Sequence, residues 1–445
     1  MSSNSIDSSQ ISVAEMAKRA RASSRHLARL SNDGRNEVLA AAAKAIESGA
    51  QSILDSNERD CRAAEPLLAS RKMSAAMFAR LRVTAKGIED MAARVRDVAR
   101  LPDPLGRRLK TTELDDDLVL SKETCPLGVV GIVFESRPDV VPQVASLAVK
   151  SGNALLLKGG AEARHTNETL VGLWRRCLKD CSSAQTDAVQ LLHTRSDVME
   201  LLTLERDVDL VIPRGSREFV EFVARNSRVP VLGHGEGICH VYVDRAADVE
   251  KALRITLDSK TQYPAACNAA ETLLVHEGIA QRFLPSVVAE LKAAGVEVRG
   301  CSKTVALLGI QDIRPAKEED WVTEYSDRIL SIKVVSDFNE AIAHIQRYGS
   351  RHTETIVTED AEAARKFMEE VDAAGVFHNA STRFADGFRY GLGAELGIST
   401  SKLHARGPVG LEGLTTYKYK LFGDGHIVAE YSSGTRRFKH VASAG

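Results

Sequence analysis

Apolar positions in the first hundred residues recur at the spacing of α-helices. Side chains three or four positions apart lie on one side of a helix, and several apolar ones follow this rule: Val38, Leu39, Ala42, Ile46 and Ile53. From about residue 12 to residue 100 the chain contains one proline, Pro66. The pattern predicts several consecutive helices after a short disordered tail.

Residues 101–128 have a different pattern. LPDPLG ends the helical region, and the alternation of apolar and polar side chains in LDDDLVLSKETC is typical of a short, exposed β-hairpin. We expect this hairpin to contribute to an oligomer contact.

Short apolar strands then alternate with amphipathic helices. The predicted strands are VVGIV, ALLLK, DAVQLLH, VDLVI and VPVL. The helices between them begin near Pro138, Ala161, Ser196 and Ser216. This alternation predicts a parallel, doubly wound sheet of the nucleotide-binding type.

A second alternating series follows and predicts a second α/β domain. Its strands are CHVYVD, ETLLVH, ILSIKVV, TETIVT and AGVFHN, and helices are expected at about 248–262 and 279–294. The glycine-rich run from Gly233 to Gly237 marks the expected hinge between the two domains.

Composition excludes several classes of protein. The chain has 445 residues, 44% of them hydrophobic, and its 59 basic residues nearly cancel its 60 acidic ones. No global charge therefore draws it to nucleic acid or to an anionic membrane. No apolar stretch approaches the ~20 residues of a membrane span.

The seven cysteines lack disulfide-scaffold spacing, which indicates a reducing compartment. Cys177 and Cys181 stand four apart, but no second ligand pair follows at zinc-site spacing, so we predict two cysteines on a helix and no metal site. The Ser- and Arg-rich N-terminus resembles a transit peptide. Because helical spacing continues beyond it, we expect a cytoplasmic protein, with a mitochondrial location as the minor alternative.

Two features of the first α/β series are candidates for cofactor binding. The turn in VDLVIPRGSREFVEF contains Gly215 and Ser216, and such a turn directs backbone N–H groups and a positive helix end toward a phosphate. Lys158 ends the strand ALLLK and should emerge at the carboxyl edge of the sheet, where ligands of such folds bind. An ordinary turn and a solvated lysine are the structural alternatives.

Cys267 is the candidate nucleophile. It lies in QYPAACNAAET, between a predicted helix and the strand that begins near Glu271. A thiol in a loop punctuated by proline near a hinge can meet a substrate, whereas most single cysteines are small buried hydrophobic residues. The local pattern leaves both interpretations open.

Three long blocks resemble the gamma-glutamyl phosphate reductase family of the aldehyde dehydrogenase superfamily. They are CPLGVVGIVFESRPDVVPQVASLAVKSGNALLLKGG, YPAACNAAETLLVH and GISTSKLHARGPVGLEGLTTYKY, and the similarity runs from about residue 12 to residue 430. The resemblance implies an aldehyde dehydrogenase-like α/β fold. An NADP-binding domain would comprise residues 1–110 and 127–236, a catalytic domain 237–417, and a small β oligomerisation element 111–126 and 418–445.

The resemblance also implies roles for single residues. Cys267 matches the family's nucleophile, Lys158 the lysine that reaches the adenosine ribose, and Gly215 with Ser216 the cofactor turn. Glu395, in GAELGIST, resembles the glutamate that holds the nicotinamide ribose in aldehyde dehydrogenases, with a surface carboxylate as the alternative.

Two departures from the wider superfamily are informative. ESRPD puts Arg137 near the position of an asparagine oxyanion donor, and its fork of donors suits a phosphate or carboxylate; a structural arginine that ties a loop is the alternative. Hydrolytic members carry a water-activating glutamate at the hinge, where this chain has a glycine, Gly233 by our comparison. Glu236 lies close by, so a role for it stays open.

The implied activity is NADPH-dependent reduction of L-glutamyl 5-phosphate to L-glutamate 5-semialdehyde in proline biosynthesis. A Cys267 thioester would be the intermediate, and oxyanion donors are expected from the backbone of Cys267 and the Asn268 region. We expect a homo-oligomer, a dimer or tetramer, and transient contact with a separate glutamate kinase, because the chain is too short to include one.

Two other functions compete with this one. An NAD(P)-dependent aldehyde dehydrogenase for another small aldehyde would not depend on phosphate, and ESRPD with the missing hinge glutamate speaks against it. A catalytically silent scaffold of the same fold would not need Cys267, Lys158 and the glycines.

Overall fold

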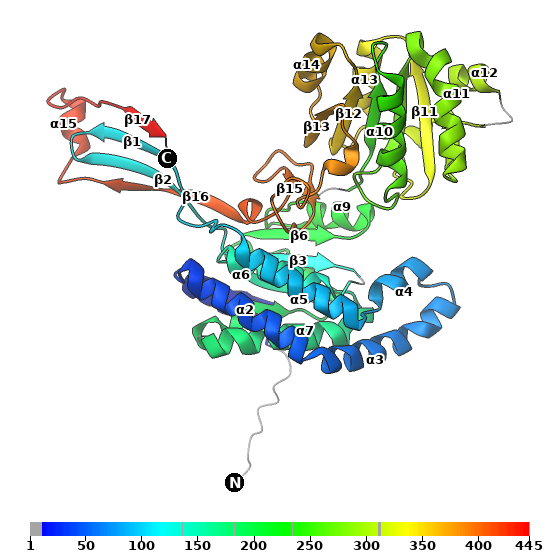
Figure 1. The fold of residues 1–445 in the computed structure, drawn as a ribbon. Coiled ribbons are helices and arrows are strands. Elements are labelled where there is room, and N and C mark those ends of the chain that lie inside the picture. The colour runs from blue at the N-terminus through cyan, green and yellow to red at the C-terminus, as the bar shows by residue number, and fades with distance from the viewer. Residues whose placement is uncertain (1–10, 136, 182, 234, 310–312, 445) are drawn as a thin grey trace. The chain divides into compact units, whose positions relative to one another are not determined.

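The computed structural model describes residues 11–135, 137–181, 183–233, 235–309 and 313–444. The predicted tail of residues 1–10 lies outside the described residues. The chain separates into two compact units: unit 1 is Met1–Leu232, Leu392–Leu396 and Val409–Gly445, and unit 2 is Gly233–Gly391 and Gly397–Pro408. Each unit is described by itself (Figure 1).

Unit 1 opens with the predicted helices: α1 (Val13–Leu27), α2 (Asn32–Ser48), α3 (Ala50–Ala69), α4 (Ala75–Leu81) and α5 (Ala85–Arg100). The apolar face predicted from spacing is buried, with Val38, Leu39 and Ile46 fully enclosed. Hydroxyl side chains start several of these helices; Ser12, for example, accepts a hydrogen bond from the N–H of Glu15, as expected of an N-cap.

The first predicted parallel sheet lies in unit 1 and has four strands in the order β5-β4-β3-β6. They are β5 (Val189–Leu191), β4 (Ala154–Lys158), β3 (Val129–Phe134) and β6 (Leu210–Arg214). The connecting helices are α6 (Val140–Lys150), α7 (Arg164–Cys181), α8 (Arg195–Leu201) and α9 (Arg217–Asn226).

Of the four or five strands expected here, the fifth, at VPVL, does not form among the described residues. Only one isolated bridge forms there, between Val211 and Val231. Pro230 accepts a hydrogen bond from the N–H of Val211 but has no N–H of its own, so it cannot extend a ladder.

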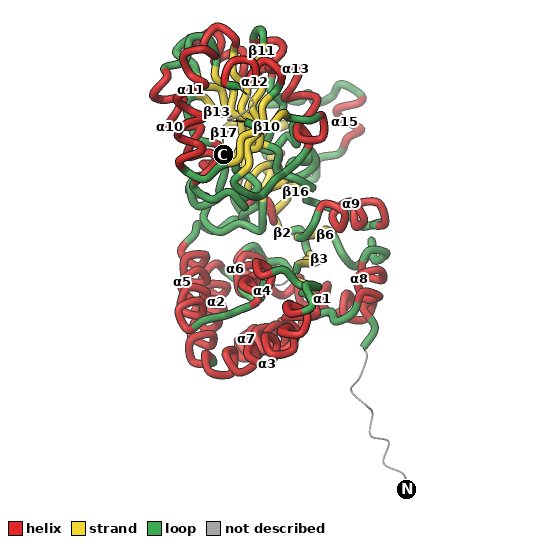
Figure 2. The backbone as a smooth tube through the Cα atoms, turned by 90° about the vertical axis from the view of Figure 1, so that its right-hand side faces the viewer, coloured by secondary structure: helices red, strands yellow, loops and turns green. Residues whose placement is uncertain are grey.

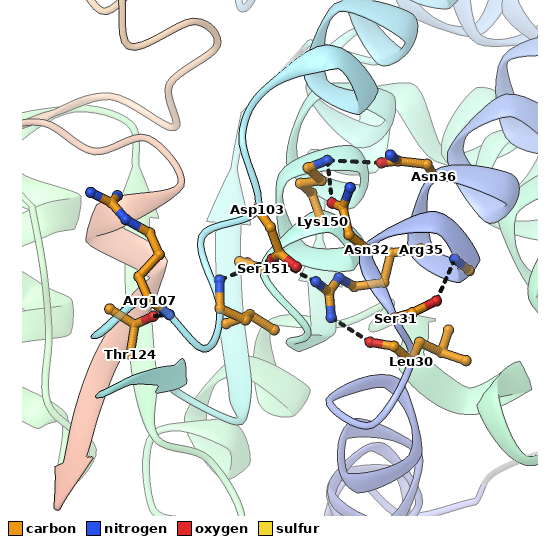
Figure 3. Close-up of polar contacts among 12 residues, drawn as sticks. Leu30, Ser31, Asn32, Arg35, Asn36, Asp103, Arg107, Thr124, Lys150 and Ser151 are labelled. Atoms are coloured by element: carbon orange, nitrogen blue, oxygen red, sulfur yellow. Dashed lines mark hydrogen bonds and ion pairs between the residues drawn. The ribbon is translucent and has the colours of Figure 1, made fainter. Parts of the chain in front are cut away.

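Two buried cations tie α2 to the rest of unit 1 (Figure 3). The Lys150 ammonium donates to the side-chain oxygens of Asn32 and Asn36, each at 2.8 Å. Arg35 lies 2.6 Å from the Asp103 carboxylate. Each of these two buried cations therefore has acceptors within the protein, as a charge removed from water requires.

The predicted hairpin is present and forms part of a larger antiparallel sheet in unit 1 (Figure 1). The order is β16-β2-β1-β17, with β1 (Arg108–Asp115), β2 (Leu118–Pro126), β16 (Thr415–Phe422) and β17 (Val441–Ala444). The short helix α15 (Val428–Ser432) precedes β17. Segments about 300 residues apart in sequence thus pair in one sheet.

Unit 2 contains a parallel sheet in the order β10-β9-β11-β8-β7-β12-β13. The strands are β7 (Cys239–Val243), β8 (Ala270–His276), β9 (Glu297–Gly300), β10 (Arg314–Pro315), β11 (Ile329–Val335), β12 (Thr353–Val357) and β13 (Gly375–His378). A separate two-stranded ladder joins β14 (Ile398–Ser399) to β15 (Gly407–Pro408).

Helices cover both faces of this sheet (Figure 2). The larger core packs α10 (Val249–Thr261) and α11 (Glu277–Ala293) on one face, with α12 (Ser302–Leu308) at its margin. The other face packs α13 (Phe338–Tyr348) and α14 (Ala361–Glu370). A sheet covered on both faces has continuous hydrophobic strands, which is why ETLLVH and ILSIKVV were recognisable in the sequence.

Candidate active site

Cys267 lies in the turn between α10 and β8, and its side chain is partly exposed. The amino end of β8 lies beside the amino end of β7, where Cys239 pairs with Ala270. The strand β12 on the other side of β7 begins directly after His352. The thiol therefore sits at the amino edge of a parallel sheet, the edge opposite to that used by doubly wound nucleotide-binding folds.

His352 is the side chain that directly faces the thiol. Its Nε2 atom is 3.3 Å from the Cys267 Sγ atom, and its Nδ1 atom is 2.9 Å from the Thr353 hydroxyl. The ring is fully buried, so both of its nitrogens are fixed by the protein. A thiol and an imidazole within hydrogen-bonding reach, with the imidazole oriented by a third group, are the parts of an activated nucleophile.

Sequence reasoning missed His352. The one feature of the sequence that could have pointed to His352 was its position directly before the predicted strand TETIVT. Only the pairing of β12 with β7 brings that position to the Cys267 loop, and strand pairing between distant segments is not visible in local periodicity.

Two further residues support the Cys267 loop from β7 and the segment before it. The Cys239 thiol is 3.4 Å from the Cys267 carbonyl oxygen and donates to it. Burial raises the pKa of the Cys239 thiol well above its ordinary value, so this group stays protonated as a donor. At Gly237, a Cβ atom would stand 1.9 Å from the same carbonyl oxygen, so only glycine allows this approach.

A buried ion pair closes the base of the Cys267 loop. Lys260, near the end of α10, places its Nζ atom 2.6 Å from the Glu271 carboxylate in β8, and both side chains are fully buried. Burial raises the pKa of Glu271, and Lys260 opposes that rise. Because the pair joins α10, before the loop, to β8, after it, it fixes the distance between the two ends of the loop.

Asn268, predicted near the oxyanion, directly follows Cys267 and is buried. Its side-chain amide donates to the Ala385 carbonyl oxygen at 2.8 Å. The amide thus ties the loop to the segment after β13, and its role toward an oxyanion stays a prediction.

Three of the predicted cofactor residues, Lys158, Gly215 and Ser216, lie at the carboxyl edge of the unit 1 sheet. Lys158 is the last residue of β4, and burial lowers the pKa of its ammonium while Glu162 opposes this. Gly215 follows β6, and the Ser216 hydroxyl caps α9 by accepting from the N–H of Phe219 at 3.4 Å. The sheet edge therefore brings Lys158 and the turn together as expected for ligands of such folds.

Carboxylates surround this edge. A Cβ atom at Gly215 would come within 3.1 Å of the Glu135 carboxyl, and one at Gly160 within 2.0 Å of the Glu162 carboxyl. Burial and the nearby Glu162 raise the pKa of Glu135. A cation beside carboxylates suits a ribose phosphate, since hydroxyls donate to carboxylates and phosphate accepts from lysine.

Comparison with known proteins shows the family. The model of the aldehyde dehydrogenase family matches residues 4–304. Gamma-glutamyl phosphate reductases of Synechococcus and Cyanothece are 55% and 52% identical, covering 95% and 98% of this chain and 92% and 99% of their own. The crystal structure of the Thermotoga maritima gamma-glutamyl phosphate reductase superimposes with a TM-score of 0.90 at 42% identity, covering 94% of this chain and 100% of the other.

The chain belongs to the gamma-glutamyl phosphate reductases. The predicted aldehyde dehydrogenase-like α/β fold is confirmed by the match to the family model and by the Thermotoga structure. Membership also implies a nicotinamide cofactor.

In this reductase, Arg137 and Glu395 both belong to unit 1. Arg137 is 45% exposed and forms an ion pair with Asp139 at 3.3 Å. The Glu395 carbonyl oxygen accepts from the Gln143 side chain of α6 at 2.6 Å. The roles assigned to Arg137 and Glu395 by resemblance stay predictions.

Glu236 lies near a second carboxylate in the reductase's unit 2. The Glu324 side chain accepts from the N–H of Gly237 at 2.9 Å, and burial together with the charge of Glu236 raises the pKa of Glu324. Sequence reasoning named Glu236 but missed Glu324, which lies in a segment without clear periodicity.

The described residues lack two further kinds of feature. They contain no group of three or more histidine, cysteine or acidic side chains arranged to hold a metal ion. No described helix is both long and apolar enough to cross a bilayer.

Proposed function

We propose that this reductase converts L-glutamyl 5-phosphate and NADPH to L-glutamate 5-semialdehyde, phosphate and NADP in proline biosynthesis. The observation that carries the proposal is the contact between Cys267 Sγ and His352 Nε2 at 3.3 Å, in a chain 55% identical to a gamma-glutamyl phosphate reductase. Cys267 is the nucleophile and His352 the base that takes its proton.

The chain's own residues account for the acyl-transfer half of the reaction. His352 accepts the thiol proton, the Cys267 sulfur attacks the acyl carbon, and phosphate leaves from the tetrahedral intermediate to give a thioester. Thr353 keeps the imidazole oriented through its Nδ1 atom. The ion pair of Lys260 with Glu271 and the bond from Asn268 to Ala385 hold the loop.

Lys158, Gly215, Ser216 and Glu395 are the proposed cofactor-binding residues. These residues suit a dinucleotide. Lys158 supplies a cation for a ribose phosphate, and the turn after β6 leads into the positive N-terminus of α9, which favours a phosphate. When bound, the reduced nicotinamide supplies the hydride that reduces the thioester to the aldehyde level. A preference for NADPH over NADH rests on Lys158 in this proposal.

A homo-oligomer is also proposed, with the antiparallel sheet β16-β2-β1-β17 of unit 1 as its contact surface. The edge strand β16 carries several large exposed apolar side chains: Tyr417, Tyr419, Leu421 and Phe422. An exposed apolar edge strand invites pairing with another chain, and a second copy of the reductase is the proposed partner. The proposed oligomerisation element comprises residues 111–126 and 418–445; contact with a separate glutamate kinase is a further part of the proposal.

The reverse reaction tests the proposed function. Wild-type protein is mixed with glutamate 5-semialdehyde and NADP, with and without inorganic phosphate, and NADPH formation is followed. We expect turnover only with phosphate. Phosphate-independent turnover with formation of glutamate would instead identify a hydrolytic aldehyde dehydrogenase, and absence of turnover would favour a silent scaffold.

A further inference from the structure

Arg383 is a deeply buried cation that, like Lys150, has no ion pair among the described residues, and its side chain has fewer acceptors than that of Lys150. Its side chain is only 7% exposed. Arg35 has Asp103 and Lys260 has Glu271 as ion-pair partners. Lys150, which has no ion pair among the described residues, instead donates to three neutral oxygens.

The partner found for the Arg383 guanidinium is neutral. Its Nε atom donates to the Gln262 side-chain oxygen at 2.9 Å. Among the described residues Arg383 forms no ion pair, and the charges of Asp386 and Asp258 act on it from beyond ion-pair distance. A buried guanidinium without a counterion is costly, and a bound anion would remove that cost.

The turn that carries Arg383 is fastened to both ends of the Cys267 loop. Arg383 reaches Gln262 at the start of the loop. Ala385, two residues later, accepts from the Asn268 side chain directly after the nucleophile. One hydrogen bond on each side of Cys267 thus ties the turn of Arg383 to the Cys267 loop, within unit 2.

The surroundings of Arg383 carry charges of both signs, and Arg389 itself pairs with Asp386 at 3.6 Å. Arg389 donates to the Arg383 carbonyl oxygen at 2.8 Å. Burial and the charge of Arg389 lower the pKa of Arg383, whereas a negatively charged Cys267 and the carboxylates of Asp386 and Asp258 raise it. The Tyr263 ring lies 5.8 Å from the guanidinium carbon. A thiolate or a bound anion is therefore the favourable neighbour for this group.

We propose that Arg383 binds an anionic oxygen group of the substrate beside Cys267. This inference rests on the proposed function and assigns to Arg383 a role that sequence comparison gave to Arg137. The substrate offers the same chemistry in two places, its phosphoryl group and its α-carboxylate, and a guanidinium fork accommodates either one with paired hydrogen bonds.

The first experiment needs no catalytic turnover. The full-length protein is alkylated with iodoacetate, an anion, or with iodoacetamide, which is neutral, and the rate at Cys267 is followed by peptide mass spectrometry. The ratio of the two rates reports the local attraction for an anion. Arg383→Met should lower that ratio about threefold or more, whereas Arg365→Met, which removes an exposed arginine of unit 2, should leave it unchanged.

The second experiment separates the two anionic groups. In the reverse reaction, phosphate and glutamate 5-semialdehyde are separate substrates with separate KM values. Arg383→Met should raise one of them about tenfold or more. A rise for phosphate assigns Arg383 to the phosphoryl group, and a rise for the semialdehyde assigns it to the carboxylate.

Several outcomes overturn the inference. Unchanged alkylation ratios and unchanged KM values for both substrates would show that Arg383 is structural. Should Arg383→Met fail to fold, Arg383→Lys carries the test: it keeps the charge but loses the fork, so one KM must still rise by about threefold. If the wild type shows no turnover, the proposed function fails, but the alkylation ratio still decides the anion site.

Discussion

The imidazole Nε2 atom of His352 stands 3.3 Å from the Sγ atom of Cys267, although 85 residues separate them in the chain. The two meet because β7 lies between β8 and β12 in the sheet, and each residue precedes its strand. The proposed nucleophile and its proposed base therefore both lie in unit 2.

Replacing the sulfur tests the covalent route. Cys267→Ser should abolish phosphate-dependent oxidation of the semialdehyde, because a serine hydroxyl is a far weaker nucleophile near neutral pH. Mass spectrometry of wild type mixed with the acyl phosphate should show an adduct on Cys267. Cys301→Ser, at a thiol in α12's N-cap position, serves as the control; an adduct elsewhere would refute the assignment.

Replacing the base tests His352. His352→Gln keeps a polar side chain but removes the basic nitrogen, so turnover should fall about 10²-fold or more, and iodoacetamide should modify Cys267 more slowly. His426→Gln, in the loop between β16 and α15 of unit 1, is the matched control. Equal alkylation rates in wild type and His352→Gln would mean that the imidazole does not activate the thiol.

Lys158→Ala tests cofactor anchoring. Loss of the ammonium at the end of β4 should raise the KM for NADPH much more than it lowers kcat, because a group that binds ground state and transition state equally affects KM. Steady-state kinetics with NADPH and NADH measure both effects. Lys86→Ala, an exposed lysine paired with Asp90, controls for charge; a fall in kcat alone would remove Lys158 from the cofactor site.

The buried pair below the loop is expected to matter for stability. Glu271→Gln leaves the Lys260 ammonium buried without its carboxylate and should cost about 3 kcal/mol of unfolding free energy. Urea unfolding measures the change. Glu277→Gln, which breaks a largely exposed pair with Lys303, should change little, and an equal effect of the two variants would show that burial is not decisive.

His344 gives unit 2 an acid-sensitive core. Burial and the charges of His240 and Lys333 lower its pKa to about 2, and the Lys333 ammonium can donate to its Nδ1 atom at 3.4 Å. Between this pKa and the ordinary value of about 6.5, the folded chain binds fewer protons than the unfolded chain. Stability therefore falls as the pH drops below about 6.5, and the loss at pH 5 is about 2 kcal/mol.

His344→Phe checks that sign. The variant should lose less stability than wild type between pH 7 and pH 5, by about the same 2 kcal/mol. Urea unfolding at both pH values, followed by tryptophan fluorescence, measures the difference. Identical pH dependence in the two proteins would contradict a neutral, buried His344.

Local patterns were sufficient for most elements of the fold. The helical face of Val38 and Ile46 is buried as predicted, and Lys158 ends its strand. Residues 297–300 and 302–308, which form β9 and α12, were not predicted, because a four-residue strand and a seven-residue helix are too short for periodicity to show.

The candidate site was only partly accessible from sequence. Cys267 was a candidate from its loop and gained its role through resemblance, Asn268 was expected as an oxyanion donor next to it, and both lie in the loop after α10. His352 and Arg383 were missed because each stands outside a periodic element. Their relevance depends on strand order and on hydrogen bonds to residues about 85 and 120 positions away.

The contact of Gly237 with the carbonyl of Cys267 limits how this protein can diversify. If position 237 is randomised in a library, the active clones should carry glycine there. Even the Cβ atom of alanine would clash with the backbone of Cys267. Converting the reductase into an acid-forming catalyst by grafting a water-activating carboxylate must therefore spare this position.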